Sequence, residues 1–177
     1  MYVVDVSNTQ SVVEIDEDFL RQVTERTLED ERINQAEISL AIVDNPTIHD
    51  LNVRYLQHDY PTDVLSFLFE SDGGDEDEAR LAESQGLTSG RRGAGKRIEG
   101  EIVVSAEMAR DMALEYGWQP RDELVLYIIH GLLHLAGYDD LDEDEMRVMR
   151  AREREILAHW KLTPRYAEDA AVDEAAS

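Results

Sequence analysis

The stretch RDELVLYIIHGLLHLAGYDD, from Arg121 to Asp140, decides how this chain is organised. Its apolar residues occur nearly all the way round a helical wheel, which is the pattern of a helix buried on every side. Two histidines interrupt the apolar run, and because His130 and His134 are four residues apart they lie on one face of the helix. Two imidazoles on one helical face can bind a single metal ion.

Two glycines shape this segment. A glycine inside a helix costs about 1 kcal/mol relative to alanine, so Gly131 indicates that another element packs closely against the backbone. Gly137 is expected to end the helix, after which Tyr138, Asp139 and Asp140 turn back towards the histidine face. The sequence therefore predicts that a carboxylate reaches the two histidines as a third ligand.

The same residues also have a structural interpretation. A histidine on an apolar helix face is commonly a core residue with a hydrogen-bond partner. Asp139 and Asp140 precede LDEDEM, where another helix begins, and aspartate is a favoured N-cap residue. One arrangement satisfies both interpretations, with Asp139 capping that helix and Asp140 ligating a metal.

Three motifs resemble a known family. HGLLHLAGYDD is similar to HGxLHLxGYDH, the signature of the YbeY family of bacterial endoribonucleases in ribosomal RNA maturation. The segment that starts at Leu51 and ends in PTDVLSF resembles the family's LNxxYRxxDxPTDVLSFP, and EGEIVVSAEMA resembles its GDIxIS strand and the helix after it. The resemblance extends from about residue 37 to residue 160 in the family's order and spacing.

The chain departs from this family at a ligand position. Asp140 stands where the family pattern has a third histidine, so the resemblance implies a metal set of His130, His134 and Asp140. Two imidazoles and one carboxylate bind zinc in several hydrolases and also suit manganese or iron. The implied cofactor is one Zn²⁺ per chain, with Mn²⁺ or Fe²⁺ as alternatives.

A second departure concerns a substrate-binding cation. The arginine that follows the tyrosine in LNxxYR is Leu56 here. Arg54 lies two positions earlier and is our candidate for the catalytic cation, while His58 lies two positions later. On a helix neither side chain projects in the direction of residue 56.

Length and composition predict one α+β domain. With 177 residues and 42% hydrophobic content, the chain is long enough to bury a substantial core. We expect a small, mainly four-stranded sheet packed with helices, the histidine-bearing helix being central. The predicted domain spans residues 1–164 and includes an inserted acidic loop at 71–97, and the acidic tail 165–177 is expected to be disordered.

Local patterns predict the individual elements. Short β-branched or alternating runs indicate strands, amphipathic runs indicate helices, and residues 71–96 are rich in Gly, Ser, Asp and Glu, which predicts a mobile irregular excursion between adjacent strands. The expected strands are Tyr2–Val6, Glu37–Val43, Asp63–Phe69 and Ile102–Val104, and the expected helices are Asp16–Asp30, Pro46–Gln57, Ala106–Tyr116, the central segment and Glu143–Trp160.

The charge of the chain opposes nucleic-acid binding unless cations gather locally. Its formal charge is −23, which repels phosphate backbones. RRGAGKR, from Arg91 to Arg97, holds four cations and is the expected contact for a polyanion, although a solvated loop that balances nearby acidic residues explains it too. Cysteine is absent, which excludes disulfides and thiolate ligands, and the N-terminus lacks a signal-peptide pattern, which predicts a cytoplasmic location.

The resemblance implies metal-dependent, single-strand-specific hydrolysis of ribosomal RNA in ribosome maturation and quality control, with the small ribosomal subunit or its proteins as further partners and no membrane. A bound metal would activate water and polarise a phosphoryl oxygen. Peptide hydrolysis of the HExxH type is disfavoured because Gly131 replaces the glutamate, which leaves Asp63 or Asp139 as the general base. The alternatives are a non-catalytic metal-binding ribosome assembly factor and a metallohydrolase of another substrate.

Overall fold

The computed structural model describes residues 1–86 and 91–166 and contains one mixed sheet in the order β1-β2-β4-β3. Strands β1 (Tyr2–Asn8), β2 (Gln35–Val43) and β4 (Arg97–Ser105) run parallel, and β3 (Val64–Asp72) is antiparallel to β4. Strand β4 has a neighbour on each side, so its buried residues join the two halves of the sheet. The predicted four-stranded α+β architecture is confirmed.

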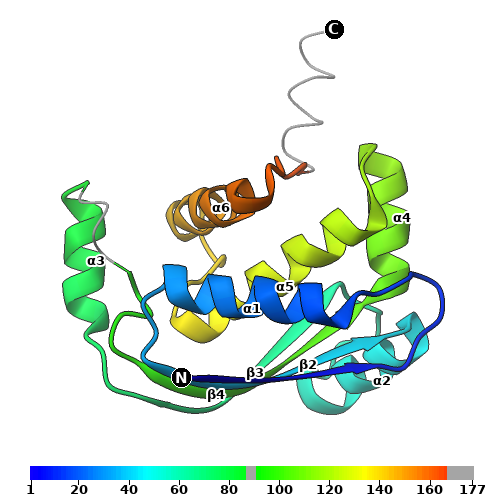
Figure 1. The fold of residues 1–177 in the computed structure, drawn as a ribbon, viewed down its shortest axis with the longest axis horizontal. Helices are drawn as coiled ribbons and strands as arrows, with labels where there is room; N and C mark the ends of the chain where they lie inside the picture. The colour runs from blue at the N-terminus through cyan, green and yellow to red at the C-terminus, as the bar shows by residue number, and fades with distance from the viewer. Residues whose placement is uncertain (87–90, 167–177) are drawn as a thin grey trace, which may run out of the picture.

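Helices cover both faces of this sheet (Figure 1). The helices are α1 (Glu17–Asp30), α2 (Asn45–Leu56), α3 (Glu76–Ser84), α4 (Ala106–Tyr116), α5 (Pro120–Ala136) and α6 (Glu143–Leu157), followed by a 3-10 turn at Ala158–Trp160. Helices α1 and α5 pack on one face over the main core, and α2 covers a smaller cluster on the other. Among the described residues, no helix has both the length and the apolar composition needed to cross a membrane.

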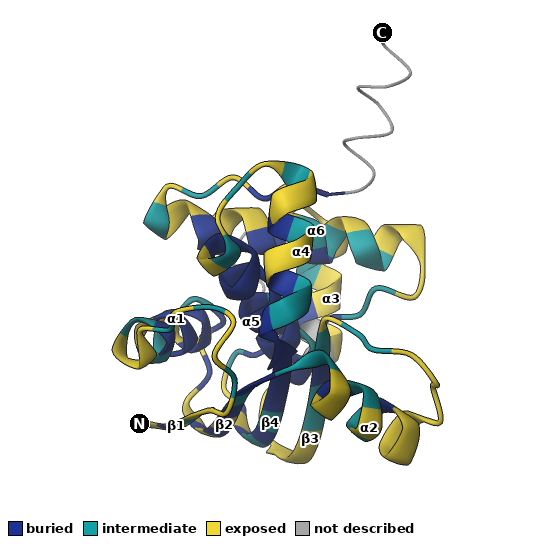
Figure 2. Cartoon of the chain, turned by 90° about the vertical axis from the view of Figure 1, so that its right-hand side faces the viewer, coloured by how far each residue is buried: buried dark blue, intermediate teal, exposed yellow. Residues whose placement is uncertain are grey.

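Helix α5 is the central element, as the sequence predicts. It contacts α1, α4, α6, β3 and β4, and in Figure 2 it is buried along nearly its whole length. A Cβ added at Gly131 would lie 3.0 Å from Cγ2 of Ile102 and from Oγ of Ser66, so only glycine lets the helix approach the sheet this closely. The expectation of close packing at Gly131 is confirmed.

The end of α5 turns the chain sharply. Gly137 has a φ of 116°, in the region that favours glycine, and its N–H donates to the carbonyl of His134. The predicted helix stop at Gly137 is therefore confirmed. The chain then returns past the histidines before α6 begins at Glu143.

The segment between β3 and β4 corrects one prediction. Residues 71–96 were expected to be irregular, but β3 continues to Asp72 and α3 occupies Glu76–Ser84. The sequence EDEARLAES consists mainly of residues with good helix propensity, and Ala79 gives the helix a buried contact. The acidic composition therefore does not prevent regular structure here, and the segment links adjacent strands as expected.

The expected disordered tail lies mainly outside the described residues, which end at 166. Tyr166, inside the predicted tail, is buried against the main core. The domain limits drawn from the sequence otherwise stay a prediction.

Candidate metal centre

Two histidine rings of α5 meet beside α6. Nε2 of His130 lies 3.1 Å from Nε2 of His134, and the ring planes are inclined at 84°. Both side chains are partly buried, with 19% and 29% of their surface exposed. The four-residue spacing therefore brings two imidazole nitrogens to one point, as predicted.

The turn after α5 carries a carboxylate to the same point. Oδ2 of Asp140 lies 3.4 Å from Nε2 of His130, and Oδ1 lies 3.7 Å from Nε2 of His134. One ligand atom from each of the three residues falls within 4.8 Å of the others. The structure thus brings together His130, His134 and Asp140, the three residues proposed as ligands from the sequence.

Outer hydrogen bonds fix the orientation of both rings. Nδ1 of His134 lies 3.2 Å from the carbonyl oxygen of Tyr138, and because a carbonyl only accepts, this Nδ1 carries the proton. Nδ1 of His130 lies 2.7 Å from Oε1 of Glu153, which is fully buried on α6. Both Nε2 atoms therefore point towards Asp140, and histidines whose Nδ1 is held by an outer acceptor are in the arrangement that metal-bound histidines usually adopt.

Glu153 was missed by sequence reasoning. Its signal is a charged residue on the apolar face of α6, between Met149 and Ile156, which are both buried. Its carboxylate also accepts hydrogen bonds from Tyr166 Oη at 2.6 Å and from Arg150 at 3.0 Å. Burial alone would favour the neutral acid, but hydrogen bonds and the charge of His130 and Arg150 lower the pKa of Glu153 and keep it ionised.

The pKa shifts of the three residues favour a positive charge within this cluster. Burial opposes protonation of His130, but hydrogen bonds to Asp140 and Glu153 outweigh it and raise the pKa of His130 to about 9. Burial, and then the charge on His130, lower the pKa of His134. The hydrogen bond from His130 lowers the pKa of Asp140. Without a metal ion, His130 therefore favours its protonated form, and its positive charge lies between the carboxylates of Asp140 and Glu153.

The donor set fits a divalent metal ion. Nitrogen ligands about 2.0–2.1 Å from a tetrahedral zinc lie about 3.3 Å apart, which is close to the separations of 3.1, 3.4 and 3.7 Å found here. Three protein ligands also leave a fourth position for water or substrate, which distinguishes a catalytic zinc site from a structural one.

A cavity of about 390 Å³ opens beside His130 and Asp140. Asp63 lines this cavity, and its carboxylate accepts hydrogen bonds from the N–H of Val64 at 2.8 Å and from Thr62 at 3.3 Å. Asp63 is therefore placed within the same cleft as the metal cluster. Its role as a base stays a prediction.

Glu123 is a second acid in this cleft, and the sequence reasoning did not single it out. It is buried, and it accepts a hydrogen bond from Trp118 Nε1 at 2.6 Å. Burial raises the pKa of Glu123, which Trp118 only partly offsets. A buried acid with a raised pKa beside a metal cluster is a candidate for proton transfer.

Asp139 does not cap the next helix. Its Oδ1 accepts a hydrogen bond from the N–H of Asp140 at 2.7 Å, whereas the N-cap of α6 is Asp142, which accepts from the N–H of Glu145 at 2.8 Å. The capping interpretation of Asp139 and Asp140 is therefore wrong. Asp139 instead shapes the turn that presents Asp140, and its catalytic role stays a prediction.

Arg54 lies apart from the three converging residues. It is on α2, is 66% exposed and pairs with Asp50 at 3.1 Å. Leu56, at the position of the family arginine, is also exposed on this helix. Arg54 is not among the residues that line the cavity beside His130, so its predicted catalytic role gains no support from its position.

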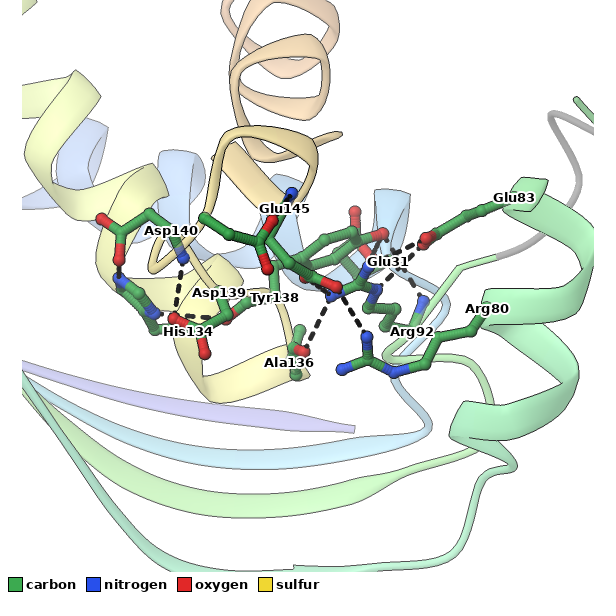
Figure 3. Close-up of polar contacts among 12 residues, drawn as sticks. Glu31, Arg80, Glu83, Arg92, His134, Ala136, Tyr138, Asp139, Asp140 and Glu145 are labelled. Atoms are coloured by element: carbon green, nitrogen blue, oxygen red, sulfur yellow. Dashed lines mark hydrogen bonds and ion pairs between the residues drawn. The ribbon is translucent and has the colours of Figure 1, made fainter. Parts of the chain in front are cut away.

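The cationic loop 91–97 corrects a second expectation. Arg92 and Lys96 are only 2% and 3% exposed, so they cannot offer their charge to a polyanion. Arg92 pairs with Glu83 at 2.9 Å and Glu145 at 2.6 Å, as Figure 3 shows. These two cations form ion pairs and hydrogen bonds inside the protein, so this part of the loop stabilises the fold.

These two side chains hold the end of α5. Lys96 Nζ donates to the carbonyl of Ala136 at 2.9 Å, and Arg92 donates to the carbonyl of Gly137 at 3.2 Å. Tyr138, the next residue, donates from its hydroxyl to Glu31 at 2.8 Å. The turn that carries Asp140 is thus fastened on both sides to buried charged groups (Figure 3).

Comparison with known proteins places the chain in a family. Residues 5–161 match the family model described as Endoribonuclease YbeY. The chain belongs to the YbeY family. It is 36% identical over 157 residues to an endoribonuclease YbeY of Carboxydothermus hydrogenoformans, a match that covers 87% of this chain and 94% of that one. It is also 36% identical to the endoribonuclease YbeY of Pelotomaculum thermopropionicum, with 89% and 97% coverage.

A solved structure shares the fold of this chain at lower sequence identity. A solution structure from Thermotoga maritima superposes with a TM-score of 0.53, covers 91% of this chain and 92% of its own, and is 23% identical. This likeness supports the α+β fold and carries no argument about the site.

Proposed function

We propose that this YbeY family member is a metal-dependent endoribonuclease that cleaves single-stranded ribosomal RNA. The observation that carries the proposal is the convergence of two Nε2 atoms and one carboxylate within 4.8 Å, next to a cavity, in a chain whose relatives are named endoribonucleases. Zinc is the proposed ion, since imidazole suits zinc and the separations fit it, with manganese or iron as alternatives because of Asp140. The cytoplasmic location and the small-subunit partners expected from the sequence stay predictions.

The residues around the metal site are proposed to have separate roles in the reaction. When bound, a divalent ion supplies Lewis-acid activation of a phosphodiester and of water. Glu153 and the carbonyl of Tyr138 keep the two Nδ1 protons in place, so that both Nε2 lone pairs stay directed at the site. Asp63 is the proposed base because it is exposed in the cleft, and Glu123, which is buried with a raised pKa, is suited to donate a proton to the leaving oxygen.

A cleavage assay with matched variants tests this function. Purified ribosomal RNA is incubated with the wild type, with and without a chelator, and with His134→Ala and His159→Ala, a control histidine that pairs with Asp30 outside the cluster. We expect cleavage by the wild type and the control, and none by His134→Ala or the chelated protein. Cleavage that survives both chelation and His134→Ala would refute the proposal.

A non-catalytic assembly factor is the rival, because Leu56 replaces the family arginine and the formal charge is −23. The same assay distinguishes it. An assembly factor would bind metal and RNA and leave the RNA intact under all conditions.

A further inference from the structure

A second groove adjoins the metal cluster along α6. It encloses about 810 Å³, and Asp140 and Arg150 line both this groove and the cavity beside His130. The groove and the cavity beside the metal cluster are therefore adjacent. Three arginines of α6 line it: Arg147, Arg150 and Arg154.

The spacing of these arginines places them on one helical face. Positions 147, 150 and 154 are three and four residues apart, so their side chains form a row about two helical turns long. Arg147 is 75% exposed, and its ion pair with Asp144 at 3.2 Å is solvent-exposed, so the guanidinium can exchange this partner at little cost. Arg154 is exposed as well.

A buried tyrosine orders two of the three guanidinium groups. The centre of the Tyr166 ring lies 4.0 Å from Cζ of Arg150 and 5.1 Å from Cζ of Arg154. Tyr166 is only 5% exposed and donates to Glu153, the carboxylate that also orients His130. The wall of the groove and the metal cluster thus share one buried anchor, which pre-orients the arginines.

The remaining surface of the groove is mixed. Leu141 is 87% exposed at its edge and Met146 is half-buried in it, while Asp142 and Glu143 lie at the start of α6. A row of guanidinium groups beside apolar side chains suits a single nucleic-acid strand. The guanidinium groups can form bidentate hydrogen bonds with the phosphates, and the bases can stack on apolar side chains and on the guanidinium planes. The three arginines balance the three carboxylates that line the groove, so a polyanion is repelled less here than a formal charge of −23 would suggest for the protein as a whole.

We propose that this α6 groove, lined by Arg147, Arg150 and Arg154, binds the single-stranded RNA on one side of the phosphodiester to be cleaved. The proposal rests on the endoribonuclease function proposed above and assigns to α6 the substrate contact that the family motif places at residue 56. It also replaces the role that the sequence suggested for the loop 91–97.

Binding without cleavage tests the groove separately from the chemistry. The affinity of the full chain for a fluorescent single-stranded oligoribonucleotide is measured in the presence of a chelator over a range of salt concentrations. The test variant is Arg147→Gln with Arg154→Gln, two exposed residues whose replacement leaves the core intact. The control is Arg21→Gln with Arg26→Gln on α1, which removes the same charge from another helix.

We expect the groove variant to lose about tenfold in affinity and its log–log salt slope to shrink by about 1.4, because about 0.7 is lost for each phosphate contact on a single strand. The control is expected to bind like the wild type. Tyr166→Phe, which keeps the ring, should bind normally, whereas Tyr166→Ala should weaken binding with a smaller change in slope, since it loosens the arginines without removing them.

Equal affinity and slope for the groove variant, the control and the wild type would overturn the groove proposal, even if the wild type cleaves RNA. Concentration-dependent dimers that only the groove variant disrupts, with RNA binding unchanged, would overturn it in favour of a second copy as the occupant. Groove-dependent binding by a wild type that does not cleave after metal loading would support the groove and refute the nuclease function.

Discussion

Asp140 is the residue at which this chain differs from the family's metal signature. Its carboxylate lies 3.4 Å from one histidine nitrogen and 3.7 Å from the other. If Asp140 is removed, two imidazoles remain, so Asp140→Ala is expected to reduce metal affinity by far more than the about 10 to 100-fold typical of outer contacts. Asp139→Ala, the neighbouring control, should cost less metal affinity because Asp139 bonds to the backbone of the turn and is not one of the three converging residues. Competition titration measures both, and wild-type zinc affinity in Asp140→Ala would place the third ligand elsewhere.

A histidine at position 140 should alter metal preference. Asp140→His restores the three-histidine set of the family, and imidazole favours zinc while carboxylate suits harder cations. We expect zinc to bind at least as tightly as in the wild type and the zinc-to-manganese affinity ratio to rise. A ratio that falls would mean that residue 140 does not contact the ion.

The proton on His130 predicts the pH dependence of metal binding. The pKa of His130 is raised to about 9, so at neutral pH an incoming ion must displace this proton. Metal affinity should therefore rise about tenfold for each pH unit between pH 6 and 8, and it would level off only near the His130 pKa. Titrations in buffers of different ionisation enthalpy should show about one proton released. A pH-independent affinity with no proton release would contradict this account.

At the scale of elements, the turn after α5 depends on Arg92. This buried guanidinium pairs with Glu83 and Glu145 and donates to the carbonyl of Gly137. Breaking a buried ion pair on one side leaves uncompensated charge, so Arg92→Ala should lower the free energy of unfolding by about 3–5 kcal/mol. Arg97→Ala, an exposed change in the same loop, should stay within about 0.5 kcal/mol. Denaturant unfolding of the two variants compares them, and equal stabilities would refute the structural role of Arg92.

The elements differ in how well they can be predicted from the sequence. Helix α5 could be predicted because its apolar residues, Gly131 and Gly137 are all local signals. Helix α3 could not, because its acidic composition hides good helix propensity and a single buried contact at Ala79. Arg92 pairs with Glu83 and Glu145, 9 and 53 positions away, and Glu153 contacts His130, 23 positions away, which no local pattern specifies. The three metal-binding candidates, by contrast, lie within eleven consecutive residues.

For the whole molecule, metal binding and folding should be coupled. The three candidate ligands come from α5 and the turn before α6, and they converge only when the chain is folded. An ion at 100 times its dissociation constant then stabilises the folded state by about 2.7 kcal/mol. Thermal unfolding with and without zinc should show this gain in the wild type and lose it in His130→Ala. A similar gain in both proteins would indicate that zinc binds elsewhere.

The central claim joins the metal cluster to RNA cleavage, and one measurement addresses it most directly. The metal content of the purified protein and its cleavage of ribosomal RNA are determined on the same samples of the wild type and His134→Ala. We predict about one equivalent of transition metal and RNA cleavage in the wild type, with both lost in the variant. Full metal content in His134→Ala, or cleavage by the metal-free protein, would contradict the account.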